Sequence, residues 1–372
     1  MSLVFDDPEP QIGDENVPAP PAIASRPLAI GSVPIPSRFF LAPMAGFTSL
    51  AFRVAVRELG GLGLATTDLV NARSLIENRT RSREIAETNE HDRPVAIQIY
   101  GHDPREMIEA AKRVVDLGAT IVDINMGCPV RKVVRSGGGS ALLCDSGGAA
   151  RLVEGIVAAV NVPVTVKTRL GWDDESPTAP ELARALERVG VAAIIVHGRT
   201  RAQGFKGRVN RIGIAGVVDA VESMPVIGNG DVRSLADAAR MFIESRCAAI
   251  SIGRGALADP FFFRRLSNWA QTGDPGPEPT FDERVNVMER CFRGLVELRG
   301  EKIACLQFRK LIKWYYHFTH MPKPIYLSMI NMANVATFDR ALVSIRAAGP
   351  SRPLVSGSKL HVPVPSGPID KW

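Results

Sequence analysis

Residues 226–255 read VIGNGDVRSLADAARMFIESRCAAISIGRG. Two short apolar runs stand at the ends of this stretch, and each is followed by a polar turn that contains glycine. Between them, residues 234–245 have the apolar periodicity of an amphipathic helix. A buried strand, a helix and a second buried strand in this order are typical of a parallel sheet covered by helices.

The same unit repeats along the chain, and eight apolar runs predict eight strands. The runs are residues 38–42, 62–67, 95–100, 120–125, 164–168, 192–197, 226–229 and 248–253. Helical stretches between them include residues 104–117, 147–160, 179–189 and 234–245. Eight such units predict an α/β fold of the (β/α)₈ TIM-barrel class. An open doubly wound sheet is the rival, but no GxGxxG motif follows the first run.

Composition changes mark four parts of the chain. Residues 1–26 are acidic and rich in proline, and we expect a disordered tail. Residues 27–272 hold the predicted barrel. After the Gly- and Pro-rich linker 271–280, residues 280–348 have helical periodicity only, which predicts a small C-terminal all-helical domain. Residues 349–372 predict a second disordered tail.

Charge and cysteine usage exclude several classes of protein. The net charge of +6 permits a polyanionic partner without requiring one. The five cysteines form no CxxC pair, so we expect neither a disulfide framework nor a metal site. No apolar run is long enough for a membrane span and no signal sequence is recognisable, so we expect a cytoplasmic protein without membrane contact.

Polar residues gather where the predicted strands end, and the active sites of (β/α)₈ barrels lie at these ends. The turns after the seventh and eighth runs, GNGD and IGRG, are typical of a phosphate site in this fold. Simple tight turns are the alternative. The strand-end candidates for a large polar ligand are Pro43, Met44, Ala45, Gln98, Asn125, Lys167, His197, Asn229, Gly230, Asp231, Gly253 and Arg254.

Three of these side chains suit a flavin. Lys167 lies at the end of an apolar run. Most lysines lie on the surface, but a lysine buried at a strand end more often faces a ligand. It could neutralise the negative charge of a reduced flavin ring. Gln98 offers both a donor and acceptors to a ring edge. His197 could reach a ring or a phosphate, or it could be a core histidine with satisfied hydrogen bonds.

Cys128 lies just after the fourth run, in the turn Gly127-Cys128-Pro129. This position puts the sulfur on a loop that faces a ligand, although most free cysteines are small buried hydrophobes. The neighbours Arg131, Lys132 and Arg135 would favour the thiolate, or they could serve an anionic substrate.

The strings LAPMAGFTSLAFR (41–53), VDINMGCPVRKVVRSGGGSALL (122–143), IVHGRTRAQGFKG (195–207) and AISIGRGALADPF (249–261) resemble those of the tRNA-dihydrouridine synthases. The resemblance runs from about residue 28 to residue 347 and is strongest to the bacterial B-type branch. Two positions depart from the family pattern: Phe205 stands where a tyrosine is common, and Val209-Asn210-Arg211 replaces an acidic-aromatic pair.

The resemblance implies an FMN-dependent reductase of tRNA uridines with a helical tRNA-binding domain and NADPH (or NADH) as reductant. It implies that Cys128 gives the proton and that Asn125 seats the base. The strand-end residues Pro43, Met44, Ala45, Gln98, Lys167, His197, Asn229, Gly230, Asp231, Gly253 and Arg254 would hold FMN. Since a proton donor must be a neutral thiol, RNA phosphates would have to screen Arg131, Lys132 and Arg135.

Basic segments offer a surface for RNA. Residues 302–338 and 188–218 contain no acidic residue. In the first segment cations alternate with aromatics, which suits phosphate contact and base stacking. A solvated basic face, with Trp314 and Tyr315 in the core, is the alternative. The candidates for tRNA contact are Arg131, Lys132, Arg199, Arg309, Lys310 and Lys313.

Two other functions stay open on the residues alone. An FMN barrel could act on a small pyrimidine, as a dihydroorotate dehydrogenase does, but such an enzyme needs no basic helical domain. A barrel that binds RNA without catalysis would contain no flavin. No obligate protein partner is predicted.

Overall fold

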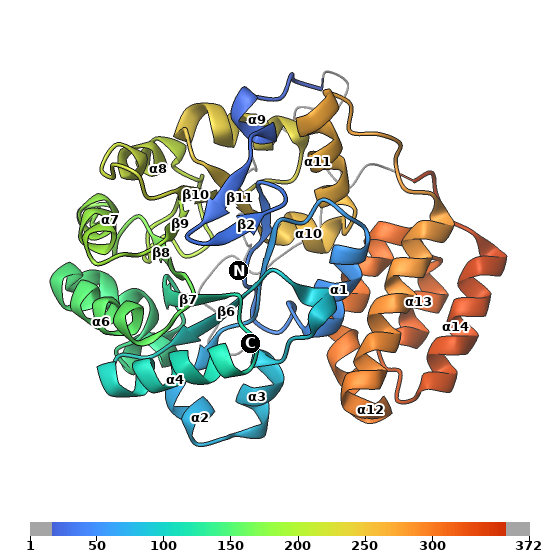
Figure 1. The fold of residues 1–372 in the computed structure, drawn as a ribbon. Coiled ribbons are helices and arrows are strands. Elements are labelled where there is room, and N and C mark those ends of the chain that lie inside the picture. Colours follow the sequence, from blue (N-terminus) through green and yellow to red (C-terminus); the bar gives the residue numbers. More distant parts are fainter. Residues whose placement is uncertain (1–16, 355–372) are drawn as a thin grey trace, which may run out of the picture.

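The computed structural model describes residues 17–354, in which eight parallel strands close into a barrel. Neighbouring strands follow the chain order, and the pairing of β4 with β6 completes the ring. Figure 1 shows helices around this ring and a helical bundle at one side. Each predicted run corresponds to one strand, although β7 and β8 each extend one residue beyond their runs. The strands are β3 (Phe39–Leu41), β4 (Leu64–Thr66), β6 (Val95–Tyr100), β7 (Ile121–Met126), β8 (Val164–Arg169), β9 (Ala193–His197), β10 (Val226–Asn229) and β11 (Ala249–Ile252).

The helices of the barrel begin where local sequence favours it. Asp103 accepts from the Glu106 N–H, and Pro104 occupies the first turn of α4. Ser234 and Asp237 form a capping box at α9. These helices are α1 (Leu50–Glu58), α2 (Ala72–Ile76), α3 (Thr80–Ala86), α4 (Pro104–Asp116), α5 (Arg131–Arg135), α6 (Ser146–Ala159), α7 (Ala179–Arg188), α8 (Arg211–Val218), α9 (Leu235–Ser245), α10 (Arg254–Ala258) and α11 (Phe262–Thr272). Short 3₁₀ turns are η2 (Ala22–Ser25), η3 (Glu90–Asp92) and η4 (Gly139–Cys144).

A small hairpin, which the sequence patterns do not predict, closes the bottom of the barrel. It consists of β1 (Leu28–Ile30) and β2 (Val33–Ile35). Ile30 and Ile35 are buried in one cluster with residues from the barrel interior, such as Phe40 and Ile121. A two-residue strand, β5 (Val70–Asn71), pairs with β6 beside the ring. The hairpin therefore covers the amino-terminal end of the barrel interior.

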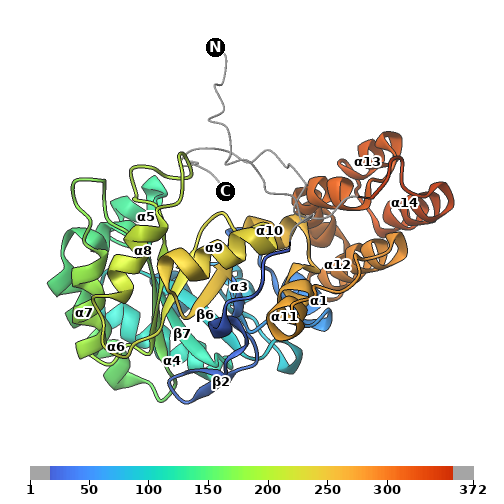
Figure 2. The ribbon, with the colours of Figure 1, turned by 90° about the horizontal axis from the view of Figure 1, so that it is seen from above.

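The C-terminal helices form the predicted helical domain. They are α12 (Phe281–Thr319), α13 (Lys323–Met329) and α14 (Val335–Ala348). Phe292 stacks on Phe338 with ring centroids 4.0 Å apart, which joins α12 to α14. α12 also packs on α1 of the barrel, and Figure 2 shows the bundle beside it. Gly300 has φ 72° and ψ 163°, so α12 is two helices joined at a kink.

Parts of both predicted tails pack against the rest of the protein. Residues 17–26 were expected to be disordered, but Ala24 is buried and the Trp269 indole donates to the Pro18 carbonyl over 2.6 Å. Within 349–354, the Ser351 N–H and hydroxyl both donate to the His320 carbonyl. These contacts lie between segments distant in sequence, so local composition does not predict them. The remaining tail residues, 1–16 and 355–372, lie outside the described residues.

None of the helices in residues 17–354 has the length and apolar character needed to cross a membrane.

Candidate active site

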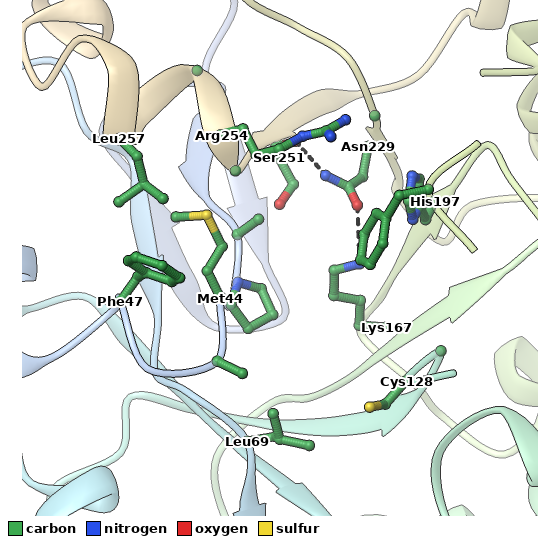
Figure 3. Close-up of a pocket in the computed structure, with 18 of the residues that line it drawn as sticks. Met44, Phe47, Leu69, Cys128, Lys167, His197, Asn229, Ser251, Arg254 and Leu257 are labelled. Carbon is green, nitrogen blue, oxygen red and sulfur yellow. Dashed lines mark hydrogen bonds between the residues drawn. The ribbon is translucent and has the colours of Figure 1, made fainter. Parts of the chain in front are cut away.

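A cavity of about 490 Å³ opens at the carboxyl ends of the barrel strands, and the second half of α12 forms one of its walls. Figure 3 shows the Cys128 thiol directed into this space, with Met44 and Phe47 on another side. All strand-end candidates line it together. They are Pro43, Met44, Ala45, Gln98, Asn125, Cys128, Lys167, His197, Asn229, Gly230, Asp231, Gly253 and Arg254.

One end of the cavity carries an ion cluster on the segments that follow β9, β10 and β11. The Arg254 guanidinium donates to Asp231 over 2.6 Å, and Arg199 donates to the other oxygen of the same carboxylate. Burial acts to raise the pKa of Asp231, but Arg199 and Arg254 hold it below its ordinary value. Gly230 has φ 130°, and a Cβ there would lie 2.6 Å from Val209. Only glycine fits this turn, which brings its backbone to the cavity.

His197 lies among cations. Burial lowers the pKa of His197 well below its ordinary value, and Arg169, Lys167, Arg199 and Arg254 lower it further. The imidazole is therefore neutral at pH 7. This surplus of positive charge suits an anionic ligand.

Lys167 reaches across the barrel mouth. Its ammonium donates to the Asn229 side-chain oxygen over 3.0 Å, and the Asn229 amide donates to the Ser251 carbonyl over 2.7 Å. Figure 3 shows both contacts. Burial, with a contribution from Arg169, lowers the pKa of Lys167 to about 8. Lys167 is thus held in place and is charged at neutral pH.

At the other end of the cavity, polar side chains of β6 and β7 lead to the Cys128 turn. The Gln98 amide donates to Asp123 over 2.6 Å, and the Asn125 amide donates to the Gln98 oxygen over 2.7 Å. The Asn125 oxygen in turn accepts the backbone N–H groups of Gly127 and Cys128. Asn125 therefore fixes the turn that carries the thiol.

The protonation of Cys128 differs from the expectation. The neighbouring cations of α5 were expected to favour the thiolate, but burial raises the pKa of Cys128 above its ordinary value. Arg131 and Lys132 are exposed and do not line the cavity. The charges that act on the thiol are instead Arg169, Asp68 and Lys167. The thiol is neutral at pH 7 without any RNA, as a proton donor requires.

The candidates for tRNA contact separate into two groups. Lys310 and Lys313 are exposed and line the cavity. Arg199 is buried and donates to the Lys206 and Gly207 carbonyls, while Arg309 donates to the Asn331 and Met332 carbonyls. Arg199 and Arg309 thus stabilise loops of the protein. Like Arg131 and Lys132, neither lines the cavity.

Two aromatic side chains of the basic segment, Trp314 and Tyr315, belong to the core. Trp314 and Tyr315 are 7% and 2% exposed. Tyr315 stacks on Phe308 with ring centroids 5.6 Å apart, so it is not available to stack on bases. Trp314 nevertheless lines the cavity, as its neighbour Lys313 does.

Sequence reasoning assigns no role to Asp123 or Arg169. Asp123 is 1% exposed in a strand that is buried throughout, and a buried carboxylate in such a strand is itself a signal. Arg169 donates to the carbonyls of Gly127, Thr200 and Gly204, so it ties the Cys128 turn to the loop after β9. Its partners lie far away in sequence, and no local pattern identifies them.

Residues 40–334 match the family model described as dihydrouridine synthase. The curated relatives include "Probable tRNA-dihydrouridine synthase 1" of Synechocystis sp., 39% identical over 295 residues, or 79% of this chain and 82% of the relative. They also include "tRNA-dihydrouridine synthase B" of Pseudomonas aeruginosa, 38% identical over 286 residues, or 77% of this chain and 86% of the relative.

Solved structures with the same fold include histamine dehydrogenase from Rhizobium sp. 4-9. Its TM-score is 0.51 at 17% identity, covering 73% of this chain and 51% of that chain. A second is TcOYE with pHBA, with a TM-score of 0.50 at 12% identity, covering 70% of this chain and 96% of that chain. At these identities the likeness concerns the barrel alone.

Proposed function

Because the chain belongs to the dihydrouridine synthase family, we propose that it reduces specific tRNA uridines to 5,6-dihydrouridine, with FMN as cofactor and NADPH or NADH as reductant. The observation that carries the proposal is the presence of a neutral, cavity-facing Cys128 thiol in the same cavity as a cationic cradle and two lysines of the helical domain.

Three features of the cavity support FMN as the ligand. Arg254 and the glycine turns at Gly230 and Gly253 suit its phosphate. Pro43, Met44 and Ala45 offer an apolar surface for a flat ring. Polar side chains opposite them suit the edge of the ring and its negative charge when reduced. We assign these polar contacts to Gln98, Lys167, His197, Asn229 and Asp231.

When bound, the reduced flavin supplies the hydride that adds to C6 of the uracil ring. The carbon that then gains negative charge is C5, and the Cys128 thiol gives it a proton. Asn125 holds the turn that carries this thiol, and Arg169 holds the same turn through the Gly127 carbonyl over 2.8 Å. Lys167 keeps its positive charge at neutral pH and orients Asn229.

The target base must leave its stack in the folded tRNA, which costs a few kcal/mol. We propose that residues 280–348 are the tRNA-binding domain and offset this cost by contacts to phosphates. Lys310 and Lys313 are its best-placed cations, since both are exposed and line the cavity. Because tRNA is the substrate, we expect the protein to act in the cytoplasm.

The test is reduction of tRNA by the purified protein. Unmodified tRNA, FMN and NADPH are incubated with the protein, and mass spectrometry maps every uridine that gains two hydrogens. We expect a gain at defined positions, and a gain at least about a hundredfold slower for the Cys128→Ala variant. Reduction of free uracil or orotate without tRNA would instead favour a small-pyrimidine reductase. A protein that binds tRNA but never retains flavin would favour RNA binding without catalysis.

A further inference from the structure

Three polar side chains lie side by side in the wall of the barrel below the Cys128 turn. Gln98 on β6 is in register with Asp123 on β7, and Asp123 is in register with Thr165 on β8. The Asp123 carboxylate accepts from Gln98 on one oxygen over 2.6 Å and from the Thr165 hydroxyl on the other over 2.6 Å. All three side chains are at most 1% exposed, so water does not compete for these contacts.

The hydrogen bonds are all donated in one direction, from the Cys128 N–H through the Asn125 and Gln98 amides to the Asp123 carboxylate. An ionised carboxylate only accepts, so Gln98 must turn its NH₂ group toward Asp123 and its oxygen toward Asn125. Asn125 must then turn its NH₂ group toward Gln98, which directs its own oxygen to the backbone N–H groups of Gly127 and Cys128. Those N–H groups only donate. Both ends of the chain of amides therefore demand the same orientation.

We propose that Asp123 is a positioning residue: its carboxylate orients the Gln98 and Asn125 amides, and these hold the turn that keeps the Cys128 thiol in the cavity. The importance of this thiol rests on the proposed function. The hydrogen-bond chain itself does not, and it can be tested without any reaction.

The ionised carboxylate of Asp123 fixes the orientation at the Gln98 end of the chain. Burial raises the pKa of Asp123 to about 6, although Gln98, Thr165 and the nearby Lys167 oppose this rise. The groups that face it are neutral Gln98 on β6, neutral Thr165 on β8 and the cation Lys167 on β8. At neutral pH the carboxylate is ionised. A protonated Asp123 could donate to the Gln98 oxygen, and only the Gly127 and Cys128 N–H groups would then fix the orientation.

The first test compares variants at Asp123 and its second partner. Asp123→Leu removes the acceptor of Gln98, and we expect kcat on tRNA to fall at least tenfold with KM changed less than about twofold. Asp123→Asn can still accept from Gln98 and donate to Thr165, so we expect kcat within about threefold of wild type. Thr165→Val is the matched control: it removes the other hydrogen bond of Asp123 and leaves the amides oriented, so a loss no greater than about threefold is expected.

The second test reverses the chain and uses no substrate. Asn125→Asp places a carboxylate against the Gln98 side-chain oxygen. If the Gln98 amide turned over, the same oxygen would instead face the Asp123 carboxylate, so neither orientation pairs every group. In the double variant Asn125→Asp with Asp123→Asn, Gln98 can turn over and every group is paired. Amide hydrogen exchange of the peptide that contains Gly127 and Cys128, measured on the cofactor-free protein, should rise at least tenfold in Asn125→Asp. In the double variant it should return to near the wild-type rate.

Two outcomes would overturn the proposal. One is an equal exchange rate in Asn125→Asp and in the double variant. The Asp123→Asn substitution would then not restore the turn, and residues 123 and 125 would not be coupled. The other is wild-type kcat in a folded Asp123→Leu. Failure to reduce tRNA in all variants, with the exchange pattern intact, would count against the proposed function and would leave the role of Asp123 supported.

Discussion

The Lys167 ammonium on β8 and the Asn229 side-chain oxygen on β10 lie 3.0 Å apart across the mouth of the barrel. The contact holds a cation, with a pKa of about 8, in a cavity that is already rich in positive charge.

An anionic flavin favours the protonated lysine, so FMN affinity should be full below pH 8 and should fall as the pH rises above it. Titration of FMN fluorescence from pH 6.5 to pH 9.5 measures this. Lys167→Gln should bind FMN more weakly and without this alkaline loss. An identical pH dependence in that variant would contradict the assignment.

Cys128 should be required for turnover and dispensable for the cofactor. A general acid contributes about 10²- to 10⁴-fold to rate, so Cys128→Ala should lose kcat by that factor while it binds FMN and tRNA normally. Because the pKa of the thiol is raised, neutral Cys128 should persist well into the alkaline range. Iodoacetamide labelling against pH, followed on the peptide that contains Cys128, measures this. Half-maximal labelling below pH 8 would show that the thiol ionises too easily for its role.

Lys310 and Lys313 should bind phosphates of tRNA. The double variant Lys310→Gln and Lys313→Gln should raise KM for tRNA, and it should reduce the slope of log affinity against log salt by about 1.4 to 1.8. Lys302→Gln is the control, because Lys302 is exposed on the same helix and does not line the cavity. Filter binding at several salt concentrations checks both. An equal effect of Lys302→Gln would point to a diffuse basic surface.

The buried charge of Asp123 should cost stability. Its folded-state pKa of about 6 lies above the ordinary value of 3.8, so the folded protein holds its proton more tightly than the unfolded chain. Stability is therefore greatest below the unfolded pKa and falls as the pH rises through 6. Between pH 5 and pH 8, wild type should lose about 1.4 kcal/mol relative to Asp123→Asn. Urea unfolding of both cofactor-free proteins at the two pH values measures this difference, and a difference that does not change with pH would contradict it.

The kink at Gly300 should depend on glycine. Its φ of 72° and ψ of 163° lie in a region that is essentially closed to other residues, while a Cβ there would contact nothing within 4 Å. Gly300→Ala should therefore lower the free energy of unfolding by about 1 to 3 kcal/mol through backbone strain alone. Gly216→Ala in α8 also meets open space but has no positive φ. It should stabilise the protein by roughly 0.5 to 1 kcal/mol, since alanine favours helices over glycine. An equal change in the free energy of unfolding for Gly300→Ala and Gly216→Ala would contradict backbone strain at position 300.

The barrel and most of its cavity could be predicted from sequence for a local reason. Apolar runs such as Val95–Tyr100 and Ile121–Met126 determine the strands, and the carboxyl ends of parallel strands in a closed barrel all meet at one mouth. A residue that ends such a run, like Gln98 or Lys167, therefore lies near the others however far apart they are along the chain. The order of strands and glycine turns was sufficient to bring Cys128 and Arg254 into one cavity.

What only the tertiary structure decided depends on burial and on distant neighbours. Cations next to Cys128 in sequence predict a thiolate, but α5 turns Arg131 and Lys132 to solvent and burial keeps the thiol neutral. Lys310 lines the cavity and Arg309, its neighbour, does not, because a helix directs successive side chains to different faces. Residue type and spacing determine which groups the mouth contains. The low dielectric of the interior and the packing of remote segments determine their charge and orientation.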